Sequence, residues 1–313
     1  MRTLIPQKEC PPVAATLLGV RRLIVNADDL GLTAGVNYAI LESHTKGVVS
    51  SATLMAGGAA FNHAVELARS APGLSVGCHV VLVDGAPVLD RAAVPSLLSN
   101  GSATGRFHSR LPAFVAQAVM GRFDREQLVD EIVAQVKKVR AAGIQVTHLD
   151  THKHTHMFPA VLEAMVAAAL MCGVPAIRNP FVPPGGMRMR HLAGRPSLWK
   201  RYGQVQILRN LGRDFREQMK KAGLATPDGL IGVVETGSLD ASLLQPALEN
   251  LPQGTWELVC HPGYHDADLR AANTRLLASR DEERRLLVSR ELREFLDQQE
   301  IQVIGYREFA SEG

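Results

Sequence analysis

Short apolar segments typical of β-strands alternate with segments of helical periodicity along nearly the whole chain. The expected strands cover residues 23–26, 48–56, 74–82, 144–149, 176–178, 230–234, 256–260 and 301–305. The expected helices cover residues 35–46, 61–70, 124–142, 159–171, 205–222, 241–251 and 279–299. A strand–helix–strand unit places its two strands parallel in one sheet, because the helix carries the chain back across the sheet. The pattern predicts an α/β protein in which seven or eight mostly parallel strands form one closed (β/α) barrel.

Composition limits the class of protein further. Residues 1–20 fall outside the pattern and are expected to form an extension ahead of a single domain at 21–313. Hydrophobic residues make up 46% of the chain, enough for a full core, and the net charge of +3 gives no reason to expect a nucleic-acid partner. The weak apolar run at 13–20 lacks an A-x-A cleavage site, and no run is long enough to cross a bilayer. We therefore expect a cytoplasmic protein without an integral membrane segment, with reduced cysteines.

The densest polar feature is a histidine stretch at residues 148–156. Four of the 11 histidines of the chain fall within these nine residues, namely His148, His152, His154 and His156. Histidine serves mainly in metal ligation and in proton transfer near neutral pH. The stretch follows an expected strand and is followed by Pro159, which can open a helix. It thus lies where α/β proteins place their chemistry, although on its own it is also compatible with a solvated loop.

Two adjacent carboxylates, Asp28 and Asp29, follow the first expected strand. Such a pair is costly beside an apolar strand unless each carboxylate has a cation or hydrogen-bond donors, and a helix cap or turn is the ordinary alternative. Successive strand residues point to opposite faces, so the two can share a site only where the strand has ended. We expect Leu30-Gly31 to end it there.

Three further polar residues lie at or near expected strand ends. His79 lies in the third strand, and His261 directly follows the strand at 256–260. Arg178 ends a brief strand and either orients a carboxylate or lies on the surface. Each alone has an ordinary explanation, but together with the Asp pair and the histidine stretch they predict one site at the carboxyl ends of parallel strands. The long loops at 83–110 and 180–200 are expected to bind the substrate there.

Carboxylates and imidazoles without a nearby thiolate suit a catalytic divalent metal, either zinc or magnesium. Such an ion lowers the pKa of a bound water and polarises a carbonyl. A second carboxylate can then act as a general base, and a histidine can protonate a leaving group. The sequence contains no G-x-S-x-G, phosphate-loop or H-E-x-x-H motif. The set therefore predicts a metal-dependent hydrolase of an amide or an ester.

Four segments together resemble the YdjC-type carbohydrate deacetylases, which include a chitooligosaccharide deacetylase and a hopanoid-biosynthesis deacetylase. They are Leu23-Ile24-Val25-Asn26-Ala27-Asp28-Asp29-Leu30-Gly31, Gly77-Cys78-His79, Thr147-His148-Leu149-Asp150-Thr151-His152-Lys153-His154-Thr155-His156-Met157-Phe158-Pro159 and Cys260-His261-Pro262-Gly263. The resemblance runs from about Arg22 to the C-terminus in the same order, with Leu30 where the family usually has Phe.

The resemblance implies a distorted TIM-like barrel that removes acetyl groups from N-acetylated sugars with a divalent metal. By motif, the metal ligands would be Asp29, His79 and His152, and the catalytic residues would be Asp28 as general base and His261 as acid or oxyanion-side residue. His154 and His156 either support the metal ligands from behind, contact the substrate or act as an alternative ligand pair. Arg178 is grouped with them as a residue that binds the substrate or supports the ligands.

The expected substrate is an N-acetylglucosamine-containing carbohydrate or glycolipid, and a homodimer is left open. Another metal-dependent amide or ester hydrolase on the same scaffold and a non-catalytic sugar-binding protein are the alternatives.

Overall fold

The computed structural model describes residues 19–99, 105–182, 199, 203 and 211–311. The expected extension at 1–20 and the second expected loop at 180–200 therefore lie almost entirely outside the described residues. Within the described ranges, no helix is both long and apolar enough to cross a membrane.

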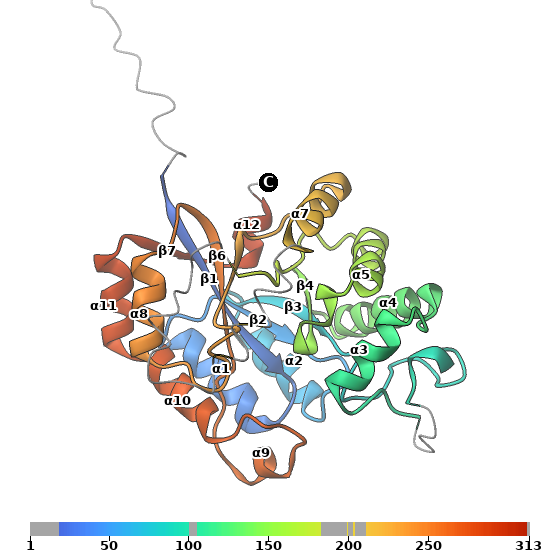
Figure 1. The fold of residues 1–313 in the computed structure, drawn as a ribbon. Helices are drawn as coiled ribbons and strands as arrows, with labels where there is room; N and C mark the ends of the chain where they lie inside the picture. Colours follow the sequence, from blue (N-terminus) through green and yellow to red (C-terminus); the bar gives the residue numbers. More distant parts are fainter. Residues whose placement is uncertain (1–18, 100–104, 183–198, 200–202, 204–210, 312–313) are drawn as a thin grey trace, which may run out of the picture.

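Seven parallel strands form one curled sheet in the middle of the molecule (Figure 1). They are β1 (Arg21–Leu30), β2 (Ser51–Leu54), β3 (Ser75–Val80), β4 (Leu149–Thr151), β5 (Gly229–Ile231), β6 (Gly254–Cys260) and β7 (Ile301–Ile304). The order is β4-β3-β2-β1-β6-β5, and β7 also pairs with β1. The central strand β1 pairs with β6 along one edge, while β7 and β2 share its other edge in succession. The side chains of β1 are buried from Leu23 onward, as expected for a parallel strand covered on both faces.

Over the described residues, the sheet curls like a distorted barrel but does not close as a full TIM barrel. Between β4 and β5, Ile177 makes a single bridge to Leu149, and Ala176 makes a single bridge to Ala225. The chain then reaches Pro180, which has no N–H to continue a ladder. The Asn179 side chain instead donates to the carbonyl oxygens of Pro227 and Asp228. The expected α/β class with parallel strands is confirmed, and the regular closure of a barrel is not.

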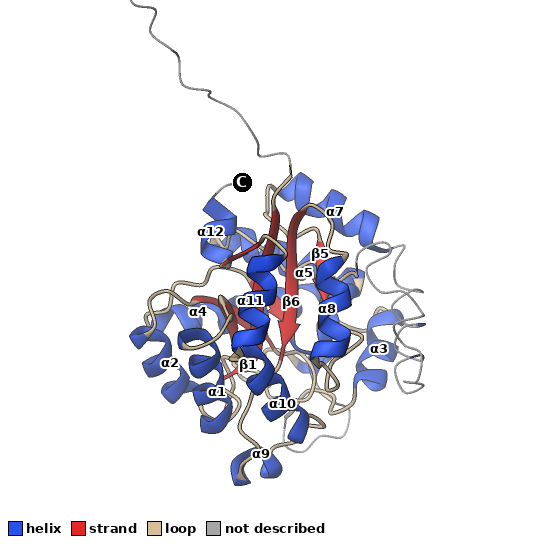
Figure 2. Ribbon diagram, turned by 90° about the vertical axis from the view of Figure 1, so that its left-hand side faces the viewer, coloured by secondary structure: helices blue, strands red, loops and turns tan. Residues whose placement is uncertain are grey.

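Helices cover the outside of the sheet. They are α1 (Ala34–Thr45), α2 (Phe61–Ser70), α3 (Leu111–Val119), α4 (Arg125–Ala141), α5 (Pro159–Cys172), α7 (Leu211–Ala222), α8 (Ala241–Glu249), α9 (Ala267–Ala271), α10 (Ala278–Leu287), α11 (Arg290–Gln298) and α12 (Tyr306–Ser311), with short 3-10 turns η1 (Pro95–Leu97) and η2 (His152–Met157). In Figure 2, β6 is seen between α11 and α8. The start of α4 is capped by Asp124, whose carboxylate accepts from the N–H groups of Glu126 and Gln127.

Several elements differ from the expected ones, and three of these differences change how the chain is divided into helices and strands. The helix expected at 279–299 is two helices, because the backbone of Ser289 is extended and its hydroxyl caps α11 by accepting from the Leu292 N–H. The fourth strand begins only at Leu149, so Asp150 lies within it rather than after it. Helix α3 follows the first long loop and was not expected, since its short apolar sequence has no polar face to give a helical period.

Candidate metal centre and active site

A cavity of about 600 Å³ opens at the carboxyl ends of the strands. It is lined by six of the residues that the sequence singles out, namely Asp28, Asp29, His79, His152, His154 and His261. The other two, His156 and Arg178, are fully buried and lie behind this lining. The structure therefore brings the residues of the four sequence motifs together at one end of the sheet.

A β-bulge lets the two neighbouring aspartates face one cavity. The sequence places the pair after a strand at 23–26, but β1 continues through both aspartates to Leu30. Asp29 has a left-handed backbone with φ 68°, and the register with β2 shifts between Ala27 and Leu30. A bulge of this kind breaks the alternation of side chains between the faces of a strand. Both carboxylates thus line the cavity.

Three possible ligand atoms lie within reach of a single ion. Asp29 Oδ1 is 3.4 Å from His79 Nε2 and 3.3 Å from His152 Nδ1, and the two nitrogen atoms are 3.3 Å apart. Tetrahedral ligands about 2.0–2.1 Å from a zinc ion are separated by roughly 3.3–3.4 Å. Asp29 Oδ1 is also buried and accepts no hydrogen bond from the described residues. These three residues therefore fit a divalent metal ion.

The orientation of His79 supports the same assignment. Its Nδ1 lies 2.9 Å from Asp150 Oδ1, and a proton shared there leaves the Nε2 lone pair facing Asp29 and His152. Metal-binding histidines commonly have such a carboxylate behind them. Burial lowers the pKa of His79, but the negative charge of Asp150 outweighs it and the pKa rises to about 9. The negative charge around His79 therefore stabilises a positive charge at this position.

Asp28 is held by Arg178 rather than by the histidines. Arg178 Nη1 donates to Asp28 Oδ2 at 2.8 Å, and Nη2 donates to Oδ1 at 2.7 Å. The amide of Asn26 donates to the same Oδ1 at 3.0 Å. Burial raises the pKa of Asp28, but Arg178 outweighs burial and holds that pKa well below its usual range. Oδ2 has the fewer donors, so its remaining lone pair is the one available to the cavity.

His261 lies beside this carboxylate at the end of β6. Its Nε2 is 3.9 Å from Asp28 Oδ2, and its backbone N–H donates to Glu283 Oε2 at 2.6 Å. Burial lowers the pKa of His261 to about 4, so the imidazole is neutral at pH 7. A neutral imidazole donates a hydrogen bond from one ring nitrogen and accepts one at the other.

The histidine stretch separates into different environments because η2 turns sharply. Lys153 and His154 both have left-handed backbones, with φ 57° and 52°. His154 lines the cavity, and burial lowers its pKa to about 3. His156 turns away: its Nδ1 lies 2.6 Å from the Thr151 hydroxyl, and its Nε2 lies 3.2 Å from the Arg178 carbonyl oxygen. With both ring nitrogens engaged, His156 supports the backbone of Arg178.

His148 is packed in the core, as its position before the strand end suggests. Its ring stacks on Tyr306 with the centroids 3.6 Å apart, and its Nδ1 lies 2.9 Å from the Thr147 hydroxyl. It does not line the cavity.

Several residues of the site were missed from sequence. Arg280 on α10 donates to Asp29 Oδ2 at 2.5 Å and is 1% exposed, yet its helix has the charged sequence of a solvated surface. Glu257 in β6 and Tyr306 at the start of α12 are also buried behind the cavity. A charged residue inside the apolar run at 256–260 was a usable signal for Glu257, because such a residue needs a buried partner.

The first expected substrate loop reaches the cavity mouth. Asp84 and Ser109 line the cavity, and Asp84 accepts from Lys153 Nζ at 2.8 Å and from Asn273 Nδ2 at 2.5 Å. Asp84 thus joins three loops across the entrance.

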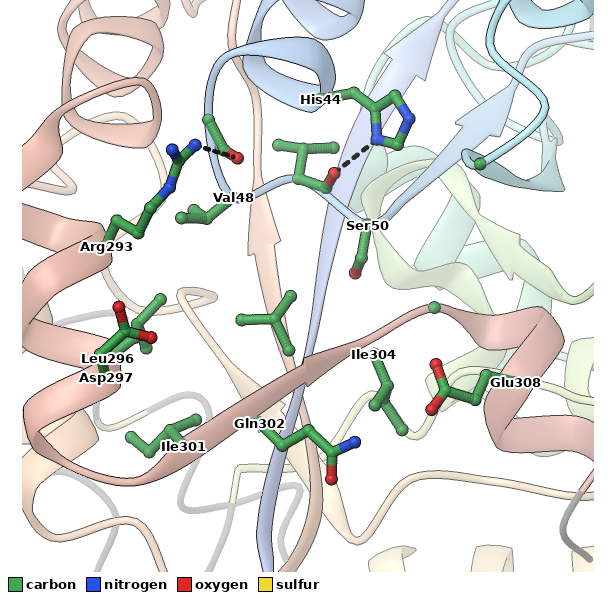
Figure 3. Close-up of a pocket in the computed structure, with 15 residues that line it drawn as sticks. His44, Val48, Ser50, Arg293, Leu296, Asp297, Ile301, Gln302, Ile304 and Glu308 are labelled. Carbon is green, nitrogen blue, oxygen red and sulfur yellow. Dashed lines mark hydrogen bonds between the residues drawn. The ribbon is translucent and has the colours of Figure 1, made fainter.

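A second cavity, of about 580 Å³, lies at the other end of the strands (Figure 3). It is bordered by β7 and by the segment 47–50 ahead of β2, and Arg293 there donates to the carbonyl oxygens of Lys46 and Gly47. None of the residues singled out from sequence lines it. In a barrel-like fold, this amino-terminal end contributes to stability rather than to catalysis.

The fold and the cavity define an α/β protein with a candidate metal centre at the carboxyl ends of its parallel strands. The chain belongs to the YdjC-like protein family, whose sequence model matches residues 22–298. The family resemblance of the four motifs is thereby confirmed.

Individual relatives are similar to this chain over nearly its full length. A carbohydrate deacetylase of Brevibacillus brevis is 32% identical, with 92% of this chain and 99% of the relative covered. A carbohydrate deacetylase of Listeria welshimeri is 31% identical, with the same coverage. The solved structure of a proposed cellobiose-phosphate cleavage protein from Enterococcus faecalis V583 is 26% identical and superposes with a TM-score of 0.72, covering 93% of this chain and 99% of that one.

Proposed function

We propose that this protein is a metal-dependent carbohydrate N-deacetylase, which hydrolyses the acetamide of an N-acetylglucosamine-containing carbohydrate or glycoconjugate and releases acetate. The observation that carries the proposal is the triad of Asp29, His79 and His152 beside a second, ionised carboxylate, Asp28, in one cavity. The names of the relatives direct the proposal to acetylated sugars.

In this proposal Asp29, His79 and His152 hold a divalent ion, either zinc or magnesium. When bound, such an ion lowers the pKa of a water molecule and polarises the acetyl carbonyl. Arg178 keeps Asp28 ionised and fixes its orientation, and Oδ2, the oxygen with fewer donors, is the atom that accepts the proton of the attacking water. His261, neutral and 3.9 Å from that oxygen, donates a hydrogen bond on the side of the developing negative oxygen or of the departing nitrogen. The proton taken up by Asp28 then passes to the amine.

Acetate release tests the proposal directly. The protein, loaded in turn with zinc, magnesium, manganese and cobalt, is screened against chitooligosaccharides, free N-acetylglucosamine and N-acetylglucosaminyl lipids. We expect metal-dependent acetate release from at least one class, abolished by a chelator. Hydrolysis of other esters, amides or phosphoesters without acetate release from any sugar would favour another metallohydrolase on this scaffold. Binding of the sugars without turnover would favour a sugar-binding protein.

A further inference from the structure

All three nitrogen atoms of the Arg178 guanidinium lie close to carboxylate oxygens. A guanidinium has five N–H groups, and the side chain of Arg178 makes five close contacts. Nε and Nη2 contact Glu257 Oε1 at 2.8 and 2.7 Å. Nη2 and Nη1 contact Asp28, and Nη1 also lies 2.6 Å from Asp150 Oδ2. Because each guanidinium nitrogen lies within 2.8 Å of a carboxylate oxygen and the side chain is fully buried, the position of Arg178 decides how Asp28 and Asp150 are held.

Glu257 fixes the edge of Arg178 that faces away from the cavity. Because Glu257 Oε1 contacts both Nε and Nη2, the guanidinium cannot rotate in its plane without breaking a contact. The other oxygen, Oε2, accepts from the Tyr306 hydroxyl at 2.5 Å. Tyr306 is itself held by the stack on His148 and by a hydrogen bond from its backbone N–H to Ser51 Oγ at 3.0 Å. All of these side chains are fully buried.

We propose that Glu257 and Tyr306 are positioning residues that act on the active site through Arg178. Neither lines the cavity. Through Arg178 they hold the Asp28 carboxylate toward the cavity, and they hold Asp150 against His79 Nδ1. The effect on Asp28 rests on the proposed function, whereas the effect on His79 concerns metal binding alone.

A contribution to stability alone does not account for this arrangement. Three carboxylates around one buried guanidinium leave excess negative charge, and buried ion pairs return little stability compared with apolar packing. Burial in this cluster raises the pKa of Glu257 to about 7 against the opposing effect of Arg178, so keeping Glu257 charged is unfavourable. What the cluster does supply is a fixed orientation for two carboxylates of the site.

The test compares Tyr306→Phe and Glu257→Gln with a matched control, Tyr264→Phe. Tyr264 also donates its hydroxyl to a glutamate, Glu42 Oε2 at 2.7 Å, but both side chains are only partly buried and neither lines the cavity. Glu257→Leu, which removes both oxygens, is compared with Glu257→Gln, which keeps one acceptor. Thermal unfolding of each metal-free variant checks folding.

Two quantities are measured for each folded variant: zinc affinity by calorimetric titration, and kcat and KM for acetate release. We expect Tyr306→Phe and Glu257→Gln to weaken zinc affinity by about threefold to tenfold, near the lower end of effects known for groups behind metal ligands. We also expect kcat to fall about tenfold with KM within about twofold, since the perturbed carboxylates act in the transition state. Glu257→Leu should lower both the zinc affinity and kcat further than Glu257→Gln does.

The two hypotheses fail separately. Zinc affinity and kcat within about twofold of Tyr264→Phe would overturn the positioning role. If the unmodified protein releases no acetate from any N-acetylated sugar, the proposed function fails, and the zinc titration alone then decides the positioning role.

Discussion

Asp28 and Asp29 are neighbours in sequence but have different partners. Asp29 offers one oxygen to two imidazoles and the other to Arg280. Both carboxylate oxygens of Asp28 accept hydrogen bonds from Arg178. The first arrangement suits a metal ligand and the second suits an oriented base, which is why substitutions at the two positions should have different effects.

Asp28→Asn removes the proposed base and keeps the shape of the side chain. We expect acetate release to fall by about 10²–10⁴-fold, the usual contribution of a general base, while bound metal stays near that of the unmodified protein. Asp29→Asn should instead lose metal. Metal analysis by mass spectrometry together with the acetate assay separates the two, and loss of metal from Asp28→Asn without loss of rate would contradict the assignment.

His148 should make stability depend on pH. Burial holds its pKa well below 6.5, so it stays neutral in the folded protein while it gains a proton on unfolding below about pH 6.5. The unfolded state binds the extra proton, and stability therefore falls as the pH falls. Between pH 7.5 and 5.5 this group should cost about 1.4 kcal/mol.

Urea denaturation of the unmodified protein and of His148→Gln at both pH values measures that contribution. The variant lacks the titrating ring, so its free energy of unfolding should fall by about 1.4 kcal/mol less over the same interval. Equal pH dependence in the two proteins would show that His148 does not contribute.

At the scale of elements, residues with strained backbone conformations are concentrated around the cavity. Five non-glycine residues in the described ranges have positive φ, and four of them line the cavity, namely Asp29, Asp84, Lys153 and His154. Such conformations persist where the surrounding structure enforces them, typically at functional sites. The bulge in β1 and the turn in η2 are therefore part of how the site is built.

Close packing of β3 against the segment before β4 should make Gly77 sensitive to substitution. A Cβ at Gly77 would lie 2.5 Å from His148 Cε1, closer than real contacts allow. We expect Gly77→Ala to lower the free energy of unfolding by about 1–3 kcal/mol, as overpacked cores do. Urea denaturation checks this. Gly57→Ala is the control, since its nearest atom would be 3.7 Å away and its effect should stay within about 0.5 kcal/mol. A Gly77→Ala protein as stable as the control would contradict the packing argument.

At the scale of the whole molecule, the candidate ligands join separate elements. Asp29 lies in β1, His79 in β3 and His152 at the start of η2. An ion held by all three would bind the folded chain and not the unfolded one, and so would stabilise the fold by mass action.

Zinc at about 100 times its dissociation constant should therefore raise the free energy of unfolding by about 2.7 kcal/mol. Differential scanning fluorimetry should show a higher melting temperature with zinc and reversal by a chelator. His152→Ala, which removes a partly exposed ligand, should lose most of this shift. An equal shift in that variant would place the zinc elsewhere.

The sequence alone was sufficient for the α/β class, the parallel strands and six of the residues that line the cavity. The reason is local: strand and helix periodicities are short-range, and parallel strands bring their carboxyl ends to one edge. Tertiary structure was needed for the partners of those residues. Arg178 and Asp28 are 150 positions apart, and Arg280 and Asp29 are 251 apart. Which buried cation meets which carboxylate depends on how the sheet curls and where α10 packs, and neither leaves a periodic signal in the chain.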